Sequence, residues 1–285
     1  MCLIVNHTLL IHNCPMNLRQ TPSYANFMEN TGWKIEHLHN LSFFRKRILF
    51  LGNFIKLQRP EILNLSDIKT IITKFRLLYF LVEPKNQKQH QTLINLGFSP
   101  TQPFIPSRTI TIDLTPSQKE IYQKFKKDCR YSIRKSASLA VKKTRQLSSF
   151  RTTWKKAVGL KRYIPSLSDL IQLKKAFGSQ SLFLFNQELG AGAIFLVADN
   201  TCYYWYAFTA QKGRQKLIQY QIIWQGMLWA KKKKCKTFDF EGIYDKRFPN
   251  KSWLGFTHFK RSFNGKEVEY PQSVRRINIF WWVKQ

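Results

Sequence analysis

Three short apolar runs separated by tight polar turns constrain the fold of this 285-residue chain more than any other feature. They cover residues 182–185, 191–198 and 202–209, and they predict an antiparallel meander of three strands. The segment 216–233 that follows is apolar at helical spacing, with almost no polar face before its lysine-rich end. We therefore expect this helix to be buried against the sheet.

The first half of the chain has a similar order of elements at low resolution. A short helix near Tyr24, a wholly apolar strand at residues 77–82 and another strand at residues 109–113 are expected there. A basic, weakly periodic stretch follows at residues 142–168. We place the junction of two units in it, which predicts an α+β fold with units at residues 16–145 and 146–271, without a residue-level repeat.

The charge balance is strongly basic, with 47 Lys and Arg against 16 Asp and Glu and a net charge of +31. Such a field concentrates polyanions, and nucleic acid is the first partner to consider. A composition biased by AT-rich coding is the alternative explanation. That bias alone would not explain so few acidic residues.

Cysteine and histidine give no sign of a metal site or a disulfide framework. The five cysteines form no Cys-x-x-Cys pair, and the six histidines have no metal-ligand spacing. We therefore expect neither a metal nor a cofactor, and a reducing cytosol fits best. No apolar run approaches the roughly 18 residues of a membrane span. The N-terminus does not resemble a signal peptide, and residues before about Met16 are a candidate for sequence preceding the native start.

Two arginines lie four residues apart in a long helix expected to begin near Thr115 and to run beyond Lys135. Arg130 and Arg134 therefore share one helix face. Their guanidinium groups repel unless an anion lies opposite them, so one interpretation is a phosphate-binding face. The other is a solvated basic surface.

An alternating segment, residues 237–242, places Asp239 and Glu241 on one face of a strand and two phenylalanines on the other. Two carboxylates on one face are notable in a chain with so few acids. They could bind a cationic substrate, accept a proton, or pair with a nearby Arg or Lys in a structural role.

A short helix then places Lys260 among three phenylalanines. Phe256, Phe259 and Phe263 fall on one helix face, and the stem of Lys260 runs along it. An ammonium group beside aromatic rings is partly desolvated, so it can act as a fixed cation or as a base with a lowered pKa. A lysine whose amine simply reaches solvent is the alternative.

Six motifs in this order resemble the Fem family (FemABX) of peptidoglycan-bridge aminoacyltransferases, which includes lipid II:glycine glycyltransferase-like enzymes. The resemblance extends from about Gln20 to Tyr270. The motifs are Gln20-x-Pro22-x-Tyr24 with Gly32-Trp33, Arg130-Tyr131-x-Ile133-Arg134-Lys135, Tyr204-x-Tyr206 before a Trp-containing helix, Phe238-Asp239-Phe240-x-Gly242, Gly255-Phe256-x-x-Phe259-Lys260 and Tyr270-Pro271.

The resemblance implies two GNAT-like domains, with mixed sheets flanked by helices, meeting at a cleft. A final strand within residues 272–285 would return to the first domain. The family transfers an amino acid from aminoacyl-tRNA, a co-substrate and not a cofactor, to the stem-peptide amine of a lipid-linked or UDP-linked peptidoglycan precursor. The sequence departs from the family at Glu241, where Gly is common, and at Asn264. It also lacks the helical arm that some members carry, and these departures leave the choice of acceptor most open.

The resemblance also implies roles for individual residues. Lys260 is the expected catalytic residue, since the family lysine assists the tetrahedral intermediate and holds the end of the tRNA. Its neighbour Phe259 and the motif residue Tyr206 are expected to bind substrate. Asp239 or Glu241 would orient the amine, and Arg130 and Arg134 would hold acceptor phosphates or the tRNA backbone.

Two other functions compete with this one. A GNAT-type N-acyltransferase using acyl-CoA would need a glycine-rich loop for the pyrophosphate, and the nearest match, Gln211-Lys212-Gly213-Arg214, has one glycine. A non-enzymatic RNA-binding or membrane-surface protein would gather its cations and aromatics on one platform, whereas here the cations are spread along the chain. We expect a cytoplasmic protein, with peripheral contact to the anionic inner membrane surface left open.

Overall fold

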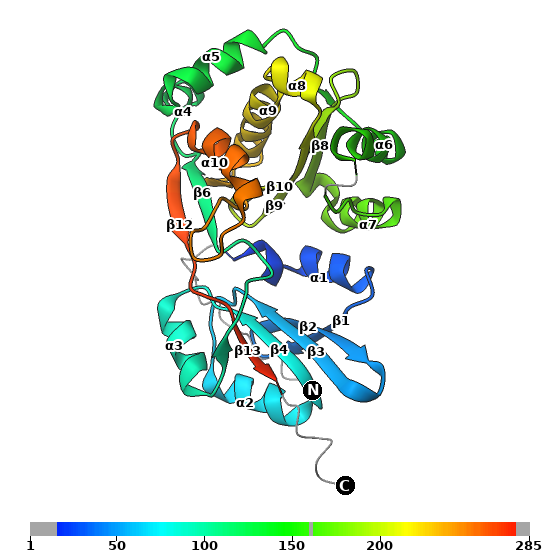
Figure 1. The fold of residues 1–285 in the computed structure, drawn as a ribbon, viewed down its shortest axis with the longest axis vertical. Helices are drawn as coiled ribbons and strands as arrows, with labels where there is room; N and C mark the ends of the chain where they lie inside the picture. Colours follow the sequence, from blue (N-terminus) through cyan, green and yellow to red (C-terminus); the bar gives the residue numbers. More distant parts are fainter. Residues whose placement is uncertain (1–15, 160–161, 278–285) are drawn as a thin grey trace, which may run out of the picture.

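Two mixed β-sheets flanked by helices make up the molecule in the computed structural model, which describes residues 16–159 and 162–277 (Figure 1). The predicted α+β class is confirmed. The three strands and the buried helix expected in the second half are present, and the helix packs on the sheet they form.

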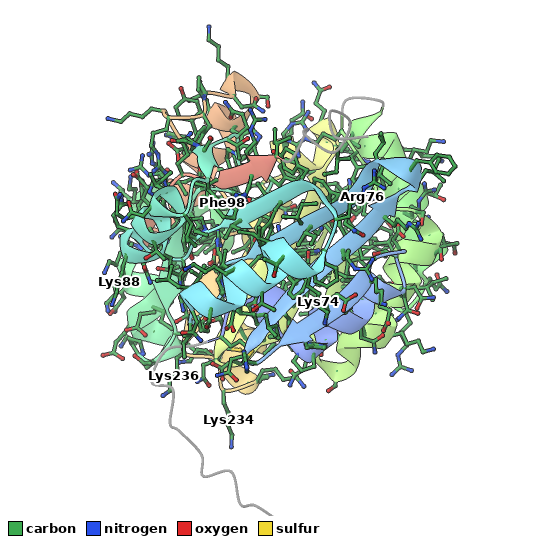
Figure 2. The ribbon with its side chains drawn as sticks, turned by 90° about the horizontal axis from the view of Figure 1, so that it is seen from below. Lys74, Arg76, Lys88, Phe98, Lys234 and Lys236 are labelled. Carbon is green, nitrogen blue, oxygen red and sulfur yellow. The ribbon has the colours of Figure 1, made fainter. Side chains whose placement is uncertain are left out.

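The first sheet has six strands in the order β1-β2-β3-β4-β13-β5. β3 and β4 are parallel and joined by a crossover helix, whereas the other pairs are antiparallel. Helices α2 and α3 cover one face, and α2 crosses the strands in the view of Figure 2. The elements are β1 (Lys34–Leu38), β2 (Leu41–Ile48), β3 (Gly52–Gln58), β4 (Leu77–Glu83), β5 (Ser99–Pro100), β13 (Val274–Ile277), η1 (Leu18–Gln20), η2 (Leu49–Leu51), α1 (Pro22–Glu29), α2 (Leu65–Lys74) and α3 (Gln87–Asn95).

The second sheet has seven strands in the order β12-β6-β11-β10-β9-β8-β7, and only β10 and β11 run parallel. Helices α5 and α9 pack on one face, and α6 and α7 on the other. The elements are β6 (Arg108–Asp113), β7 (Lys142–Lys143), β8 (Ser181–Asn186), β9 (Ala191–Ala198), β10 (Thr201–Thr209), β11 (Thr237–Asp239), β12 (Lys266–Glu269), α4 (Gln118–Lys124), α5 (Lys127–Lys135), α6 (Leu147–Val158), α7 (Leu167–Phe177), η3 (Gly178–Gln180), α8 (Gln211–Gln215), α9 (Ile218–Lys232), η4 (Lys251–Trp253) and α10 (Leu254–Arg261).

Helix α1 lies between the two sheets and joins their cores (Figure 1). Its Tyr24 and Met28 belong to one buried cluster with Phe44 of the first sheet and Leu170 of α7. The Tyr24 ring meets Phe44 edge-on, with centroids 5.6 Å apart. Because apolar packing is continuous through α1, the two sheets are held together by core contacts.

The chain changes sheets earlier than the predicted boundary near residue 145. Strand β6 and helices α4 and α5 belong to the second sheet and its core, which includes Ile110, Phe125 and Cys129. The division therefore falls within residues 101–107, and two domains with one sheet each remain our prediction. Strand β13 returns to the first sheet. Residues 278–285, the rest of the segment 272–285 in which this strand was expected, lie outside the described residues.

The long helix expected from Thr115 is two helices. Ser117 caps α4 in a capping box with Glu120. At Phe125 the backbone becomes extended, and its ring is buried edge-on against Trp224 and Phe263. Burial of this ring accompanies the helix break that separates α4 from α5.

Candidate active site

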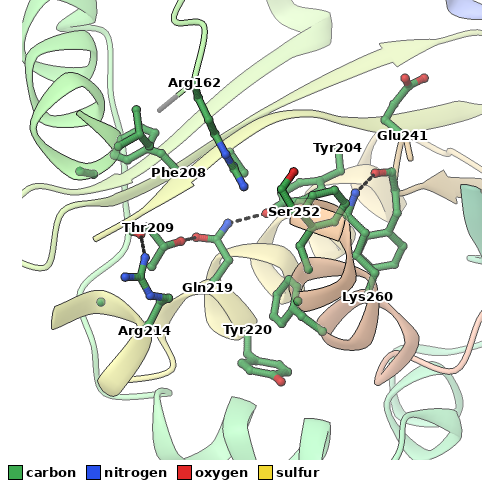
Figure 3. A pocket seen from close by; sticks show the side chains of 18 of the residues that line it. Arg162, Tyr204, Phe208, Thr209, Arg214, Gln219, Tyr220, Glu241, Ser252 and Lys260 are labelled. Atoms are coloured by element: carbon green, nitrogen blue, oxygen red, sulfur yellow. Dashed lines mark hydrogen bonds between the residues drawn. The ribbon is translucent and has the colours of Figure 1, made fainter. Parts of the chain in front are cut away.

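A pocket of about 910 Å³ lies on the second sheet between β10, the start of α9, α10 and the end of α6 (Figure 3). It does not lie between the two sheets. The residues that line it are Ala157, Val158, Gly159, Arg162, Tyr204, Trp205, Ala207, Phe208, Thr209, Gly213, Arg214, Leu217, Gln219, Tyr220, Phe240, Glu241, Ser252, Gly255, Phe256, Phe259 and Lys260.

A divergence of two parallel strands creates this space. β10 and β11 pair through Tyr203 and Asp239, and β11 ends there while β10 continues to Thr209. Beyond Tyr203, no described strand pairs with that edge of β10. The pocket therefore borders backbone N–H and C=O groups that lack a strand partner, a position where an extended ligand can bind.

Lys260 lines the pocket although its side chain is only 8% exposed. Its Nζ donates to the carbonyl oxygens of Phe240, at 2.7 Å, and Gly242, at 2.6 Å. The amine also lies 5.0 Å from the ring centroid of Phe256. An ammonium group has three N–H donors, and no other described residue accepts from this one, so one donor remains for a ligand.

Burial controls the acidity of this amine. Removal from water lowers the pKa of Lys260 to about 7, and the negative charges of Asp239 and Glu241 only partly oppose that effect. The predicted lysine held beside aromatic rings is therefore present. Its amine does not reach out into solvent, as the alternative interpretation required.

In the chain, Glu241 lies between the two residues whose carbonyl oxygens accept from Lys260, but its carboxylate is paired with Arg19. The two oxygens accept from Arg19 Nη1 at 3.0 Å and from Nη2 at 2.7 Å, and both side chains are almost fully buried. Burial would raise the pKa of Glu241, but the charge and hydrogen bonds of Arg19 hold it below its usual value. Glu241 also has a φ of +57°, a conformation that favours glycine.

Asp239 is turned away from the pocket towards the neighbouring strand. Its Oδ1 accepts from Thr109 Oγ1 at 2.5 Å and from the backbone N–H of Glu241 at 2.8 Å. Burial, followed by repulsion from Glu241, raises the pKa of Asp239. Of the structural and catalytic roles considered for the two acids, these contacts fit the structural one.

Three other residues expected to bind substrate were Arg130, Arg134 and Tyr206, and none of them lines the pocket. Arg130 donates to the carbonyl oxygens of Gln123, at 2.9 Å, and Phe125, so it caps the end of α4. The two arginines therefore do not form a shared anion site at the pocket.

A β-bulge explains the position of Tyr206. The register of β9 and β10 shifts between Tyr204 and Tyr206, so Trp205 is an extra residue on β10. Tyr204 consequently packs with the α9 side of the sheet and Tyr206 with the α6 side, against Trp154. Strict alternation would have placed both tyrosines on one face. Phe259, by contrast, lines the pocket.

A hydrogen-bonded chain that the sequence did not reveal runs along the pocket from Thr209 to Tyr204, which lies beside Lys260 (Figure 3). Thr209 Oγ1 donates to Gln219 Oε1 at 2.6 Å, and Gln219 Nε2 donates to the Tyr204 hydroxyl at 2.7 Å. Burial raises the pKa of Tyr204, so its hydroxyl stays neutral. No described residue accepts the Tyr204 O–H, which leaves that donor for a ligand.

The charges at the pocket are mainly positive. Arg162 and Arg214 line it together with Lys260, whereas its one acid, Glu241, is neutralised by Arg19. Arg214 donates to the Thr209 carbonyl at 2.6 Å, and Arg162 projects over the pocket (Figure 3). In the described part of the chain, no group of three or more His, Cys, Asp or Glu could hold a metal ion. None of the helices in that part is long and apolar enough to cross a bilayer.

Comparison with known proteins gives a family match over part of the chain and a fold for nearly all of it. Residues 173–275, which include α9, β11 and α10, match the model described as "FemAB family". The crystal structure of FemX superposes with a TM-score of 0.78 at 14% identity, covering 95% of each chain. A search of curated proteins gives no match.

Two further solved structures have the same fold. L-PGS from Bacillus licheniformis superposes with a TM-score of 0.61 at 11% identity, covering 92% of this chain and 89% of that one. The C-terminal domain of a putative lysylphosphatidylglycerol synthetase from Agrobacterium fabrum gives 0.58 at 11% identity, over 90% and 88%. Together, these comparisons show that residues 173–275 are similar to the FemAB family and that the whole chain has the fold of FemX.

Proposed function

We propose that this protein is a transferase that moves an amino acid from aminoacyl-tRNA to the stem-peptide amine of a peptidoglycan precursor. The observation that carries this proposal is Lys260, a buried amine with one unused donor in a pocket of a chain that matches the FemAB family over residues 173–275. A cytoplasmic location goes with the proposal, because charged tRNA is found there.

The proposed reaction needs no covalent enzyme intermediate. The acceptor amine attacks the ester carbonyl of the aminoacyl-tRNA, a C–N bond forms and the C–O bond to the terminal ribose breaks. Overall, one proton passes from the amine to the departing ribose oxygen. The negative charge that develops on the carbonyl oxygen would be stabilised by the third N–H of Lys260, with the Tyr204 hydroxyl as a second donor. One such donor in a dry site contributes on the order of 3–4 kcal/mol.

The two carbonyl acceptors fix where the Lys260 charge lies. They come from Phe240 and Gly242, which flank Glu241, and the buried Arg19 holds that acid in place. We therefore give Arg19, Asp239 and Glu241 positioning roles.

The positive pocket suits the end of a tRNA. Arg162 and Arg214 would lie beside the phosphates that precede the ester, and the net charge of +31 would attract the rest of the polyanion. We no longer assign the acceptor phosphates to Arg130, because its guanidinium is occupied by α4 carbonyl groups.

An acyl-CoA-dependent N-acyltransferase remains the second candidate because the end of the pocket away from Lys260 could bind a pyrophosphate. Gly213, Arg214 and the first turn of α9 lie there, and a helix N-terminus beside an arginine can bind a pyrophosphate. This site has one glycine and would have to bind pyrophosphate without a glycine-rich loop. A non-enzymatic RNA-binding protein, the third candidate, would leave the unused donors in this pocket without a purpose.

Product masses distinguish these functions. The protein would be incubated with a pool of charged tRNAs and, in separate reactions, UDP-linked precursor, lipid-linked precursor, or phosphatidylglycerol, the acceptor suggested by the names of the lysylphosphatidylglycerol synthetases. A parallel set would contain acetyl-CoA in place of tRNA. We expect a precursor mass increased by one aminoacyl residue only with charged tRNA. Acetylated precursor, aminoacylated lipid alone, or tRNA binding without any product would each contradict the proposal.

A further inference from the structure

The tip of the β2–β3 hairpin carries three consecutive exposed apolar residues. Leu49 is 78% exposed, Phe50 81% and Leu51 45%, and they form the short helix η2. In residues 16–159 and 162–277, no other consecutive run of large apolar side chains is this exposed. Single exposed apolar residues are ordinary on protein surfaces, but a run at a protruding tip indicates an interaction site.

The tip is held in a defined shape by its base. Ile48 pairs with Gly52, and the next residue, Asn53, donates to the Arg76 carbonyl from its backbone N–H at 2.8 Å and from its side chain at 3.0 Å. Gly52 has a φ of +124°, and a Cβ there would lie 2.8 Å from the same carbonyl oxygen. The turn that carries the three apolar side chains therefore has a defined backbone conformation.

Three exposed cations lie beside this tip. Exposed Lys46 and Arg47 precede it on β2, and Lys74 ends α2 next to the β4 segment that anchors the hairpin. Figure 2 labels Lys74 and Arg76 on this part of the molecule. Of the five Lys and Arg in residues 41–60, Lys46 and Arg47 are exposed, whereas Arg45 is paired with Glu36 of the neighbouring strand.

We propose that residues 46–51, together with Lys74, form a docking element for the surface of an anionic lipid bilayer. The apolar tip would enter the headgroup region while the cations remain among the lipid phosphates, as in other interfacial protein segments. A groove on another protein could accept the apolar residues, but it would not account for the exposed Lys46, Arg47 and Lys74 beside them. The inference goes beyond the proposed function: membrane binding can occur without transfer, and it would bring the protein to a lipid-linked acceptor.

Vesicle co-sedimentation tests this with the full chain and with lipids that contain no peptidoglycan precursor, so the outcome is independent of transfer. Vesicles would contain phosphatidylcholine alone or with phosphatidylglycerol. We expect binding to the mixed vesicles, at least about tenfold weaker for the Leu49→Ser/Phe50→Ser/Leu51→Ser variant. The matched control is Tyr163→Ser/Ile171→Ser, which removes exposed apolar residues from the second sheet's helices and their loop and should bind as the parent does.

Charge removal and hydrogen exchange complete the test. Arg47→Ala and Lys74→Ala should each weaken binding about fivefold, since a cation near an anionic surface contributes about 1 kcal/mol. Mixed vesicles should also slow amide exchange in residues 47–53 of the parent. The proposal is overturned if the parent does not bind, if the triple variant binds equally well, or if vesicles without phosphatidylglycerol are bound as tightly. Protection of another surface and not the hairpin would also overturn it.

Discussion

Replacement of Glu241 by glycine sets two opposing effects against each other. With a φ of +57°, the position has the left-handed conformation that glycine adopts without strain. The same replacement leaves the guanidinium of Arg19 buried without its carboxylate partner, because the two side chains are only 3% and 6% exposed. The sign of the stability change therefore shows which effect is larger.

The magnitudes favour the ion pair. A non-glycine residue in the left-handed conformation costs about 1–2 kcal/mol of folding free energy, and glycine at this position removes that cost. Removal of one partner from a buried, bidentate pair costs about 3–5 kcal/mol. We therefore expect Glu241→Gly to lower the free energy of unfolding by about 1–4 kcal/mol.

A double-mutant cycle with Arg19→Met separates the charge from other causes. Arg19→Met alone leaves the carboxylate unpaired and should cost about 3–5 kcal/mol, whereas the double variant buries no unpaired charge and should approach the parent. Urea unfolding of the four proteins, followed by circular dichroism, measures the cycle. Stability of Glu241→Gly equal to or above that of the parent, or strictly additive losses, would refute the reasoning.

Three further predictions concern the pocket and the sheet. If protonated Lys260 acts, the transfer rate should fall as pH rises through about 7, the pKa that burial gives this amine, and Lys260→Arg should lose this fall; a rate that rises through pH 7 would indicate a neutral base. Tyr204→Phe should slow single-turnover transfer at least about tenfold by removing one donor, and an unchanged rate would exclude that role. Gly226→Ala should cost about 1–3 kcal/mol in urea unfolding, because its Cβ would lie 2.3 Å from the Phe195 ring, while Gly255→Ala, also in a helix but with open space, should cost nothing.

Local patterns in the sequence predicted much of the fold and part of the site. Apolar runs of the right length identified the strands of the second sheet, and helical spacing placed Lys260 among aromatic rings. Both depend on neighbours within a few residues along the chain. The same patterns could not fix the domain boundary, since the assignment of β6 to a sheet depends on distant strand partners.

The missed features of the site depend on distant contacts or on broken alternation. Arg19 is 222 residues from Glu241 in the chain, and no local pattern connects them. One signal in the sequence could have indicated the left-handed conformation of Glu241, namely that glycine is common at this position in the family. The bulge at Trp205 reverses which face Tyr206 occupies, and neither composition nor periodicity indicates where a strand gains a residue.

Single-turnover transfer from charged tRNA to precursor by Lys260→Met tests the central claim most directly. Lys231 supplies a matched control, because its Nζ also donates to two backbone carbonyls, of Leu114 at 2.6 Å and Pro116 at 2.5 Å, outside the pocket. We predict that Lys260→Met loses on the order of a hundredfold or more in rate, while Lys231→Met transfers at close to the parent rate. A parent-like rate for Lys260→Met, or an equal loss in both variants, would contradict the account.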